Sequence, residues 1–73
     1  MKKQYIIAEN YRQYTDYINH KLNKWEYIYV YDKIVLFGTN FSTIYLIGTY
    51  YLRKDWYILK EILEINQSKI IYE

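Results

Sequence analysis

Residues 43–65 read TIYLIGTYYLRKDWYILKEILEI, and this stretch decides the fold of the chain. It begins with a short apolar run, Ile44 to Ile47, which stops at Gly48-Thr49. A charged corner, Arg53-Lys54-Asp55, then opens an amphipathic segment from Trp56 to Ile65. This succession predicts a buried strand, a turn and a helix, which is the basic unit of a parallel α/β sheet. Such sheets bind their ligands just beyond the carboxyl ends of the strands.

The rest of the chain supplies three more apolar runs and a second helical segment. Asn10 can cap the first helix, Gln13 is placed for a reciprocal contact, and Asp55 has the position of an N-cap for the second helix. The connection 32–42 is predicted to contain a short helical turn or an extra edge segment. We therefore expect one domain over residues 1–73 in the order βαββαβ, with strands near 4–8, 26–31, 43–48 and 69–72 and helices near 11–23 and 55–65.

Helical spacing predicts which face of each helix is buried. The first helix carries one narrow stripe of large apolar residues, and the second turns several aliphatic residues toward the sheet. These faces comprise Tyr11, Tyr14, Ile18, Leu22 and Trp25 in the first helix and Ile58, Leu59, Ile62 and Ile65 in the second. Among them we expect Ile18, Leu22, Ile58 and Ile62 to be largely buried.

Two sheet topologies fit this order of elements. A Rossmann-like sheet is parallel, with strand order 2-1-3-4 and helices on both faces, whereas a ferredoxin-like sheet pairs its middle strands as an antiparallel hairpin. Residues 6–8 and 44–47 are apolar at consecutive positions, which is typical of strands covered on both faces. The connection 32–42 also exceeds the usual length of a hairpin loop. The sequence therefore favours the parallel α/β sheet, with the ferredoxin-like fold as the alternative.

The composition argues against several classes of function. The chain has no cysteine and one histidine, so we expect no disulfide, no metal site and no cofactor. The net charge of +2 is not concentrated on one segment, which disfavours nucleic-acid binding. No apolar run reaches the roughly 20 residues that a membrane span needs. Because the N-terminus also lacks the apolar segment of a secretory signal, we expect a cytoplasmic protein. The two serines and the histidine are dispersed, so we expect that the chain is not an enzyme.

Tyrosine is the most unusual feature of the composition, with 12 tyrosines against 2 phenylalanines and 2 tryptophans. A large ring with a hydroxyl group suits half-buried positions, and tyrosine is also enriched among the anchor residues of protein interfaces. Two explanations stay open. One is an AT-rich genome combined with packing at the boundary of the core, and the other is a surface selected for binding.

The candidate binding residues are polar or aromatic side chains that follow the predicted strands. Arg53 can hold a phosphate or carboxylate, remain solvated, or pair with Asp55 or Asp32. Residues near the start of the first helix can attract an anion, although no glycine-rich phosphate motif accompanies them. The full set is Asn10, Arg12, Asp32, Thr49, Tyr50, Tyr51, Arg53 and Asp55.

Several short motifs are shared with a known group of proteins. They are Leu36-Phe37-Gly38, Ile47-Gly48-Thr49-Tyr50-Tyr51, Arg53, and Asp55-Trp56, together with an opening strand followed by Asn10-Tyr11-Arg12. With these motifs the chain resembles small phage-encoded Rossmann-like proteins of unknown function. In their pattern an apolar strand ends in Gly-Thr-aromatic and is followed by Arg, Pro and Asp; here Lys54 replaces the proline and Leu52 a usual acidic residue. The resemblance implies a viral setting and a parallel fold, and it carries no known reaction.

Three functions are compatible with these observations. The first is a protein-binding module, such as an inhibitor, anti-defence or host-takeover factor that occupies a host protein and can also form a homodimer. The second is a domain that binds a small ligand or nucleotide at the strand ends. The third is a binder of single-stranded RNA, provided that Tyr27, Tyr29 or Tyr45 lies bare on a ferredoxin-like sheet.

Overall fold

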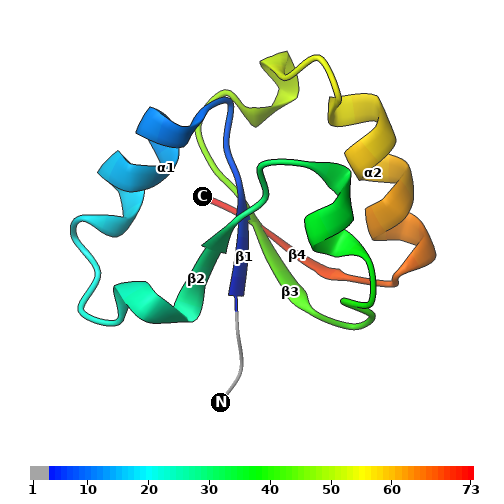
Figure 1. Ribbon diagram of the computed structural model, residues 1–73, viewed down its shortest axis with the longest axis horizontal. Coiled ribbons are helices and arrows are strands. Elements are labelled where there is room, and N and C mark those ends of the chain that lie inside the picture. Colours follow the sequence, from blue (N-terminus) through cyan, green and yellow to red (C-terminus); the bar gives the residue numbers. More distant parts are fainter. Residues whose placement is uncertain (1–3) are drawn as a thin grey trace.

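The succession of apolar strands and helical segments produces a parallel sheet (Figure 1). The computed structural model describes residues 4–73. Within them the sheet has four strands in the order β2-β1-β3-β4, and each neighbouring pair is parallel. Two helices and three 3₁₀ turns connect the strands. The elements are β1 Gln4–Ile7, α1 Tyr11–Ile18, η1 Lys24–Glu26, β2 Tyr27–Tyr29, η2 Lys33–Leu36, β3 Thr43–Leu46, η3 Tyr50–Leu52, α2 Trp56–Ile65 and β4 Lys69–Tyr72.

This topology confirms the parallel prediction and its strand order. The ferredoxin-like alternative is wrong, because β1 lies between β2 and β3 and separates the two strands that would form its hairpin. The predicted strand 26–31 is shortened to Tyr27–Tyr29. The connection 32–42 crosses over the sheet through the short helical turn η2, whose Leu36 is buried.

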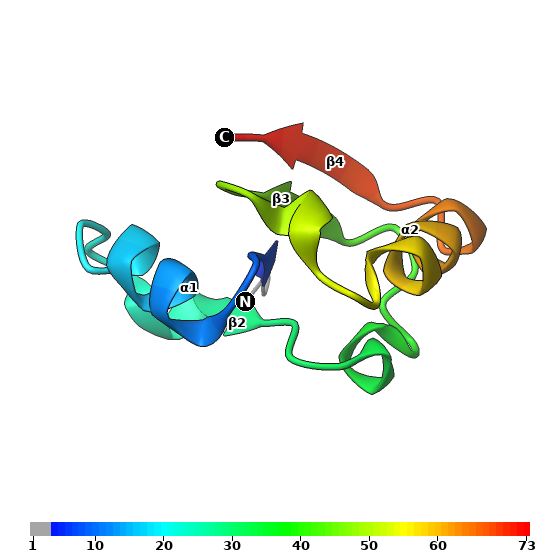
Figure 2. The same cartoon turned by 90° about the horizontal axis from the view of Figure 1, so that it is seen from above.

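The sheet separates two apolar layers, as Figure 2 shows with α1 on one side and α2 on the other. Ile6 and Ala8 of the first strand and its extension face α1, while Ile7 faces α2, and all three are fully buried. The α2 layer is the larger one and contains Ile7, Val30, Leu36, Ile44, Leu46, Leu59 and Leu63. The α1 layer contains Ile6, Ala8, Tyr14 and Ile47.

The first helix is shorter than predicted, and the far end of its apolar stripe is exposed. Asn10 caps α1 as expected, since its side chain accepts a hydrogen bond from the Gln13 backbone, but the helix ends at Ile18. The following residues 19–23 include two asparagines and a histidine, which are weak helix formers. Tyr14 is buried, whereas Leu22 is 95% exposed and Trp25 is also exposed. The predicted burial of Leu22 is therefore wrong.

The second helix faces the sheet with a different stripe from the predicted one. Leu59 and Leu63 are its buried residues, while Ile58 and Ile62 are half-buried and Ile65 is 79% exposed. Helix positions four apart in sequence lie on the same face, whereas positions two apart are separated by roughly 200° around the helix axis. Because Leu63 points inward, Ile65 must point outward. The prediction that Ile65 faces the sheet is thus wrong, and the predicted burial of Ile58 and Ile62 is only half met. The burial of Leu63 was missed.

The tyrosines gather at the boundary between core and solvent. Tyr14 is buried, six others are half-buried, and Tyr11, Tyr31, Tyr51, Tyr57 and Tyr72 are exposed. Several rings contact one another, as in the group of Tyr11, Tyr14 and Tyr29 between α1 and β2. Boundary packing therefore accounts for about half of the tyrosines, and the exposed rings are left for another explanation.

One boundary tyrosine links α1 to the end of the chain. The Tyr17 hydroxyl donates a 2.8 Å hydrogen bond to Oε1 of Glu73. Burial, together with this hydrogen bond to the Glu73 carboxylate, raises the pKa of Tyr17 above its ordinary value of 10.0. Burial also raises the pKa of Tyr14 and Tyr45. The folded chain therefore retains protons that the unfolded chain releases in alkaline solution.

We expect the free energy of unfolding to fall as the pH rises above the ordinary tyrosine pKa of 10.0. The contribution of Tyr17 is complete below that pH and is lost above it, because the unfolded state then binds fewer protons than the folded state. Urea unfolding of a Tyr17→Phe variant across this range should show a shallower fall, with the remainder due to Tyr14 and Tyr45. The exposed Tyr57→Phe serves as control, and equal slopes for all three proteins would contradict the expectation.

Candidate binding surface at the strand ends

Arg53 is the central residue at the carboxyl edge of the sheet. It follows η3, and its side chain is only 7% exposed. Nε and Nη2 donate to the two carboxylate oxygens of Asp55 at 2.9 and 3.0 Å. Nη1 donates to the carbonyls of Ala8 and Val30 at 3.3 and 2.5 Å, and Nη2 donates to the Tyr31 carbonyl at 3.3 Å. Arg53 thus ties the ends of β1 and β2 to the start of α2.

This arrangement selects one of the roles considered for Arg53. The ion pair with Asp55 forms, while Asp32 instead accepts a hydrogen bond from the Ile34 backbone and caps η2. A guanidinium has five N–H groups, and all five directions are taken by these acceptors. The guanidinium also lies 5.8 Å from the centre of the Tyr29 ring. A phosphate or carboxylate ligand would have to displace these contacts.

Asp55 does not act as the predicted N-cap. It occupies the N-cap position of α2, but its side chain makes no capping hydrogen bond. The carboxylate is turned toward Arg53, where two charge-assisted hydrogen bonds outweigh a single bond to a backbone N–H. The charged corner of the sequence is therefore a support for the fold.

The crevice between β1 and β3 is filled by the protein itself. It is the point where the chain connections diverge, which is the usual ligand site of an open α/β sheet. Gln13 accepts from the Glu9 backbone at 2.9 Å and donates to Thr49 at 3.1 Å, and the Thr49 hydroxyl donates to the Glu9 carboxylate at 2.6 Å. A Cβ atom on Gly48 would lie 2.4 Å from the Gln13 side chain. Glycine at this position therefore makes room for Gln13.

The other predicted site residues are distributed around this edge. Asn10 and Arg12 are exposed at the start of α1, and the Arg12 carbonyl accepts a hydrogen bond from Thr15. Asp32 is exposed after β2. The structure brings Thr49 to the crevice and Arg53 to the ends of β1 and β2. The partners Glu9 and Gln13 were missed as site residues, although the capping position of Gln13 was a local signal.

We call Arg53 with its hydrogen bonds to Asp55 and to the three carbonyls the Arg53 clamp. Large exposed side chains lie on the two segments that it joins. Tyr50 is half-buried and packs edge-on against Trp56, with ring centres 4.9 Å apart. Tyr51 packs on Tyr50 but remains 56% exposed. Leu52 and Tyr31 are exposed to a similar extent. We call Tyr31, Tyr51 and Leu52 the strand-end rim. Its two segments are joined by the hydrogen bond from Arg53 to the Tyr31 carbonyl.

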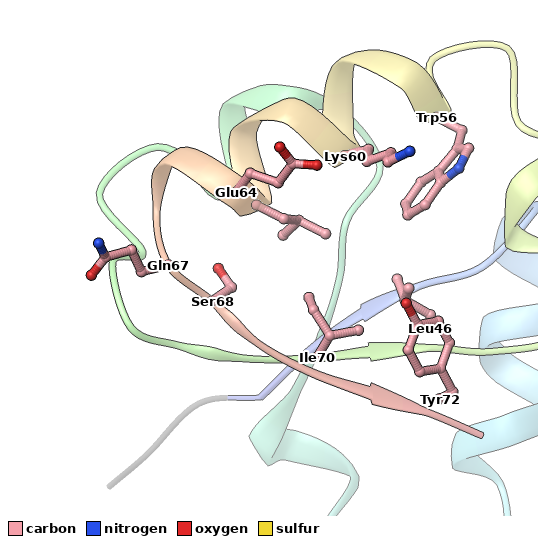
Figure 3. A pocket seen from close by; sticks show the side chains of 9 residues that line it. Leu46, Trp56, Lys60, Glu64, Gln67, Ser68, Ile70 and Tyr72 are labelled. Atoms are coloured by element: carbon pink, nitrogen blue, oxygen red, sulfur yellow. The ribbon is translucent and has the colours of Figure 1, made fainter.

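A cavity of about 420 Å³ lies elsewhere, between α2 and β4 (Figure 3). We call it the α2–β4 groove. Its walls are mainly apolar, and charged side chains from α2 stand at its margin. The lining residues are Leu46, Trp56, Lys60, Leu63, Glu64, Gln67, Ser68, Ile70 and Tyr72. None of the predicted site residues lines it, because the groove arises from the packing of a helix beside a strand.

Comparison with known protein families, with curated proteins and with solved structures found no match to this chain. Over residues 4–73, no three or more acidic or histidine side chains are grouped so as to hold a metal ion. Across the same residues, no helix has the length and apolar character required to cross a membrane.

Proposed function

We propose that this chain is a small protein-binding module that works by occupying a partner's surface and does not turn over a substrate. The observation that carries the proposal is the strand-end rim. Tyr31, Tyr51 and Leu52 are large and more than half exposed, and they flank a side chain that is almost fully buried. Tyrosine is one of the residues most often found as an interface anchor.

The Arg53 clamp supports this proposal through rigidity. Ordering side chains and loops on binding opposes association, so a surface that is already fixed binds with less entropic cost. Arg53 holds the backbone at Tyr31 and follows directly after Tyr51 and Leu52. Both segments of the strand-end rim are thereby held in place before a partner arrives.

The same edge has few free hydrogen-bonding groups and little space for a small ligand. Gln13 and Thr49 fill the crevice between β1 and β3, and the Arg53 donors are engaged within the chain. A nucleotide or anion would have to replace hydrogen bonds that already exist. Binding of a macromolecule on top of the rim requires no such exchange.

Single-stranded RNA is also less well supported. Tyr27, Tyr29 and Tyr45 do share one face of the sheet, but each is half-buried. The Tyr29 ring is in contact with the rings of Tyr11 and Tyr14 under α1, and Tyr27 meets Tyr45 edge-on. Base stacking needs an accessible ring face.

The resemblance to small phage proteins favours a host protein in the host cytoplasm as the partner.

The test uses the exposed rings of the strand-end rim. A tagged chain would capture its partner from a bacterial lysate, and affinity would then be measured by calorimetry with the purified, identified partner. We expect the double variant Tyr31→Ala/Tyr51→Ala to bind at least about tenfold more weakly, as loss of anchor residues does. Circular dichroism would verify that the variant is folded.

The matched control is Trp25→Ala, because Trp25 is also a large exposed ring but lies in η1, before β2. This variant should bind as the unaltered chain does. Equal affinity of the rim variant and the control would contradict the assignment of the interface to the strand-end rim. Saturable turnover of a nucleotide or ester by the purified chain would contradict the non-enzymatic proposal.

A further inference from the structure

The two outer edges of the sheet are treated differently by the fold. On β2, the outward carbonyl of Tyr27 accepts a 3.1 Å hydrogen bond from the Tyr14 hydroxyl. The carbonyl of Tyr29 accepts a 3.1 Å bond from the Tyr31 backbone as the chain turns. Natural proteins protect exposed edges by such local coverage, because an open edge is a template for another strand. The β2 edge is therefore closed to a further strand.

Among the described residues 4–73, none pairs with the outer edge of β4. Lys69 and Glu73 donate their backbone N–H groups to Ser42 and Leu46, at 2.9 and 3.0 Å, so these alternate positions face β3. By the alternation of a parallel ladder, the N–H and C=O groups of Ile70 and Tyr72 point away from the sheet. Figure 2 shows β4 at the outer side of β3. The edge carries two isoleucines and a tyrosine, residues with high strand propensity, and no proline interrupts it.

We propose that a second copy of this chain pairs with the β4 edge, antiparallel and about a two-fold axis at Ile71. In this register Ile70 lies opposite the partner's Tyr72, and Ile71 lies opposite the partner's Ile71. The outward groups of Ile70 and Tyr72 then form hydrogen-bonded pairs, each of which exchanges two backbone hydrogen bonds. The two sheets become one continuous sheet. This inference concerns a different surface from the strand-end rim and does not depend on the proposed function.

The charges of β4 favour this register. Lys69 and Glu73 are exposed at the two ends of the strand. The ion pair found among residues 4–73 is Arg53–Asp55, so neither Lys69 nor Glu73 forms an ion pair within the described residues. Oε1 of Glu73 accepts a hydrogen bond from the Tyr17 hydroxyl. Antiparallel pairing centred on Ile71 places Lys69 opposite the partner's Glu73 on both sides of the axis. Opposite charges in directly facing positions stabilise strand pairs, whereas like charges destabilise them.

The α2–β4 groove supports the same partner. A two-fold axis perpendicular to the sheet brings both copies of α2 to one face and makes them antiparallel. Lys60 and Glu64, which stand on the groove margin in Figure 3, then lie toward the partner's Glu64 and Lys60. The apolar walls formed by Trp56, Ile70 and Tyr72 are covered by the second copy. The backbone edge of β4, the charges at its two ends and the α2–β4 groove therefore each match the same feature on a second copy. A two-fold interface requires this self-complementarity.

The test is the mass of the purified chain, 9.2 kDa for a monomer, measured by sedimentation equilibrium from low to high micromolar concentration. We expect a rise toward twice that mass. Lys69→Glu and Glu73→Lys should each weaken the dimer at least about tenfold, because each places like charges opposite one another. The double variant Lys69→Glu/Glu73→Lys should restore association. Lys24→Glu, with the same charge change in η1 before β2, should leave the dimer intact.

Backbone pairing is tested separately at Tyr72. Tyr72→Pro removes the outward N–H group, while Tyr72→Ala removes the ring and retains that group. We expect the proline variant to associate at least about tenfold more weakly than the alanine variant, with both folded by circular dichroism. A constant monomer mass up to high micromolar concentration would overturn the proposal. So would dimerisation that Lys69→Glu and Glu73→Lys leave unchanged, or a double variant that fails to recover.

Discussion

Replacing Arg53 with alanine should lower the free energy of unfolding by about 3–5 kcal/mol, because it removes a largely buried guanidinium and leaves several acceptors without donors, each at a cost of roughly 1–3 kcal/mol where the acceptor is buried. The change deletes the donors to three backbone carbonyls, those of Ala8, Val30 and Tyr31, and leaves Asp55 without its cation. Unpaired buried carbonyls are costly. A domain of this length has a total stability of about 4–11 kcal/mol, so the variant should lose a large share of its stability.

Denaturant unfolding monitored by circular dichroism would measure the effect. Arg53→Lys should remain strongly destabilised, because an ammonium cannot reproduce the planar set of donors. Lys54→Ala is the matched control, since the neighbouring lysine is exposed and should change stability by less than about 0.5 kcal/mol. Asp55→Ala should cost less than Arg53→Ala, because the Asp55 side chain is 37% exposed and the arginine keeps its carbonyls. A loss below about 1 kcal/mol for Arg53→Ala would refute the structural role of the clamp.

Replacing Leu59 with alanine should cost about 2–5 kcal/mol, the range for large-to-small changes in a closed core. Leu59 is fully buried at the centre of the α2 layer, among Ile7, Ile44 and Leu63. The alanine side chain would leave a cavity between the helix and the sheet. On a domain this small, the loss should also lower the thermal midpoint markedly.

Ile65→Ala on the same helix is the control for this prediction. Ile65 is largely exposed, so its truncation should change stability by less than about 1 kcal/mol. The pair separates the observed orientation of α2 from the predicted one, in which Leu59 and Ile65 shared the buried face. Comparable losses at both positions would mean that the helix is rotated relative to the arrangement described above.

The difference between predicted and observed helix faces has a physical cause. The segment from Trp56 to Ile65 has apolar residues around most of its circumference, including Ile58, Ile62 and Leu63. Periodicity can locate a buried stripe only where the opposite side is polar. Which apolar residues turn inward is then settled by packing against β3 and η2.

At the candidate site, too, part of the arrangement was predicted from the sequence and part was not. The strand ends were predicted as the binding region, and the Arg53–Asp55 pair was one of the alternatives that the residues left open. The carbonyl acceptors of Arg53 belong to segments that are 22 to 45 residues away in the chain. These hydrogen bonds leave no trace in the residue types, because every residue has a backbone carbonyl. The support role of Arg53 could not be read from composition or spacing.

The amino-acid sequence by itself determined the fold class, the order of elements and the cap of the first helix. Strands that are apolar on both faces require cover on both sides, so consecutive apolar residues at 6–8 and 44–47 already favoured the parallel sheet over the ferredoxin-like alternative. Asn10 likewise caps α1 through a hydrogen bond to a residue three positions away. These features depend on neighbours in sequence, which the sequence displays directly.

The tertiary structure alone decided which surfaces are free. The crevice at the strand ends is filled because Gln13 of α1 meets Thr49 after β3, and β4 is an outer strand of the sheet that none of the other described segments of residues 4–73 pairs with on its free side. Both outcomes depend on contacts between segments distant in the chain. Burial and hydrogen bonding between such segments are set by three-dimensional packing, and the free surfaces are what that packing leaves uncovered.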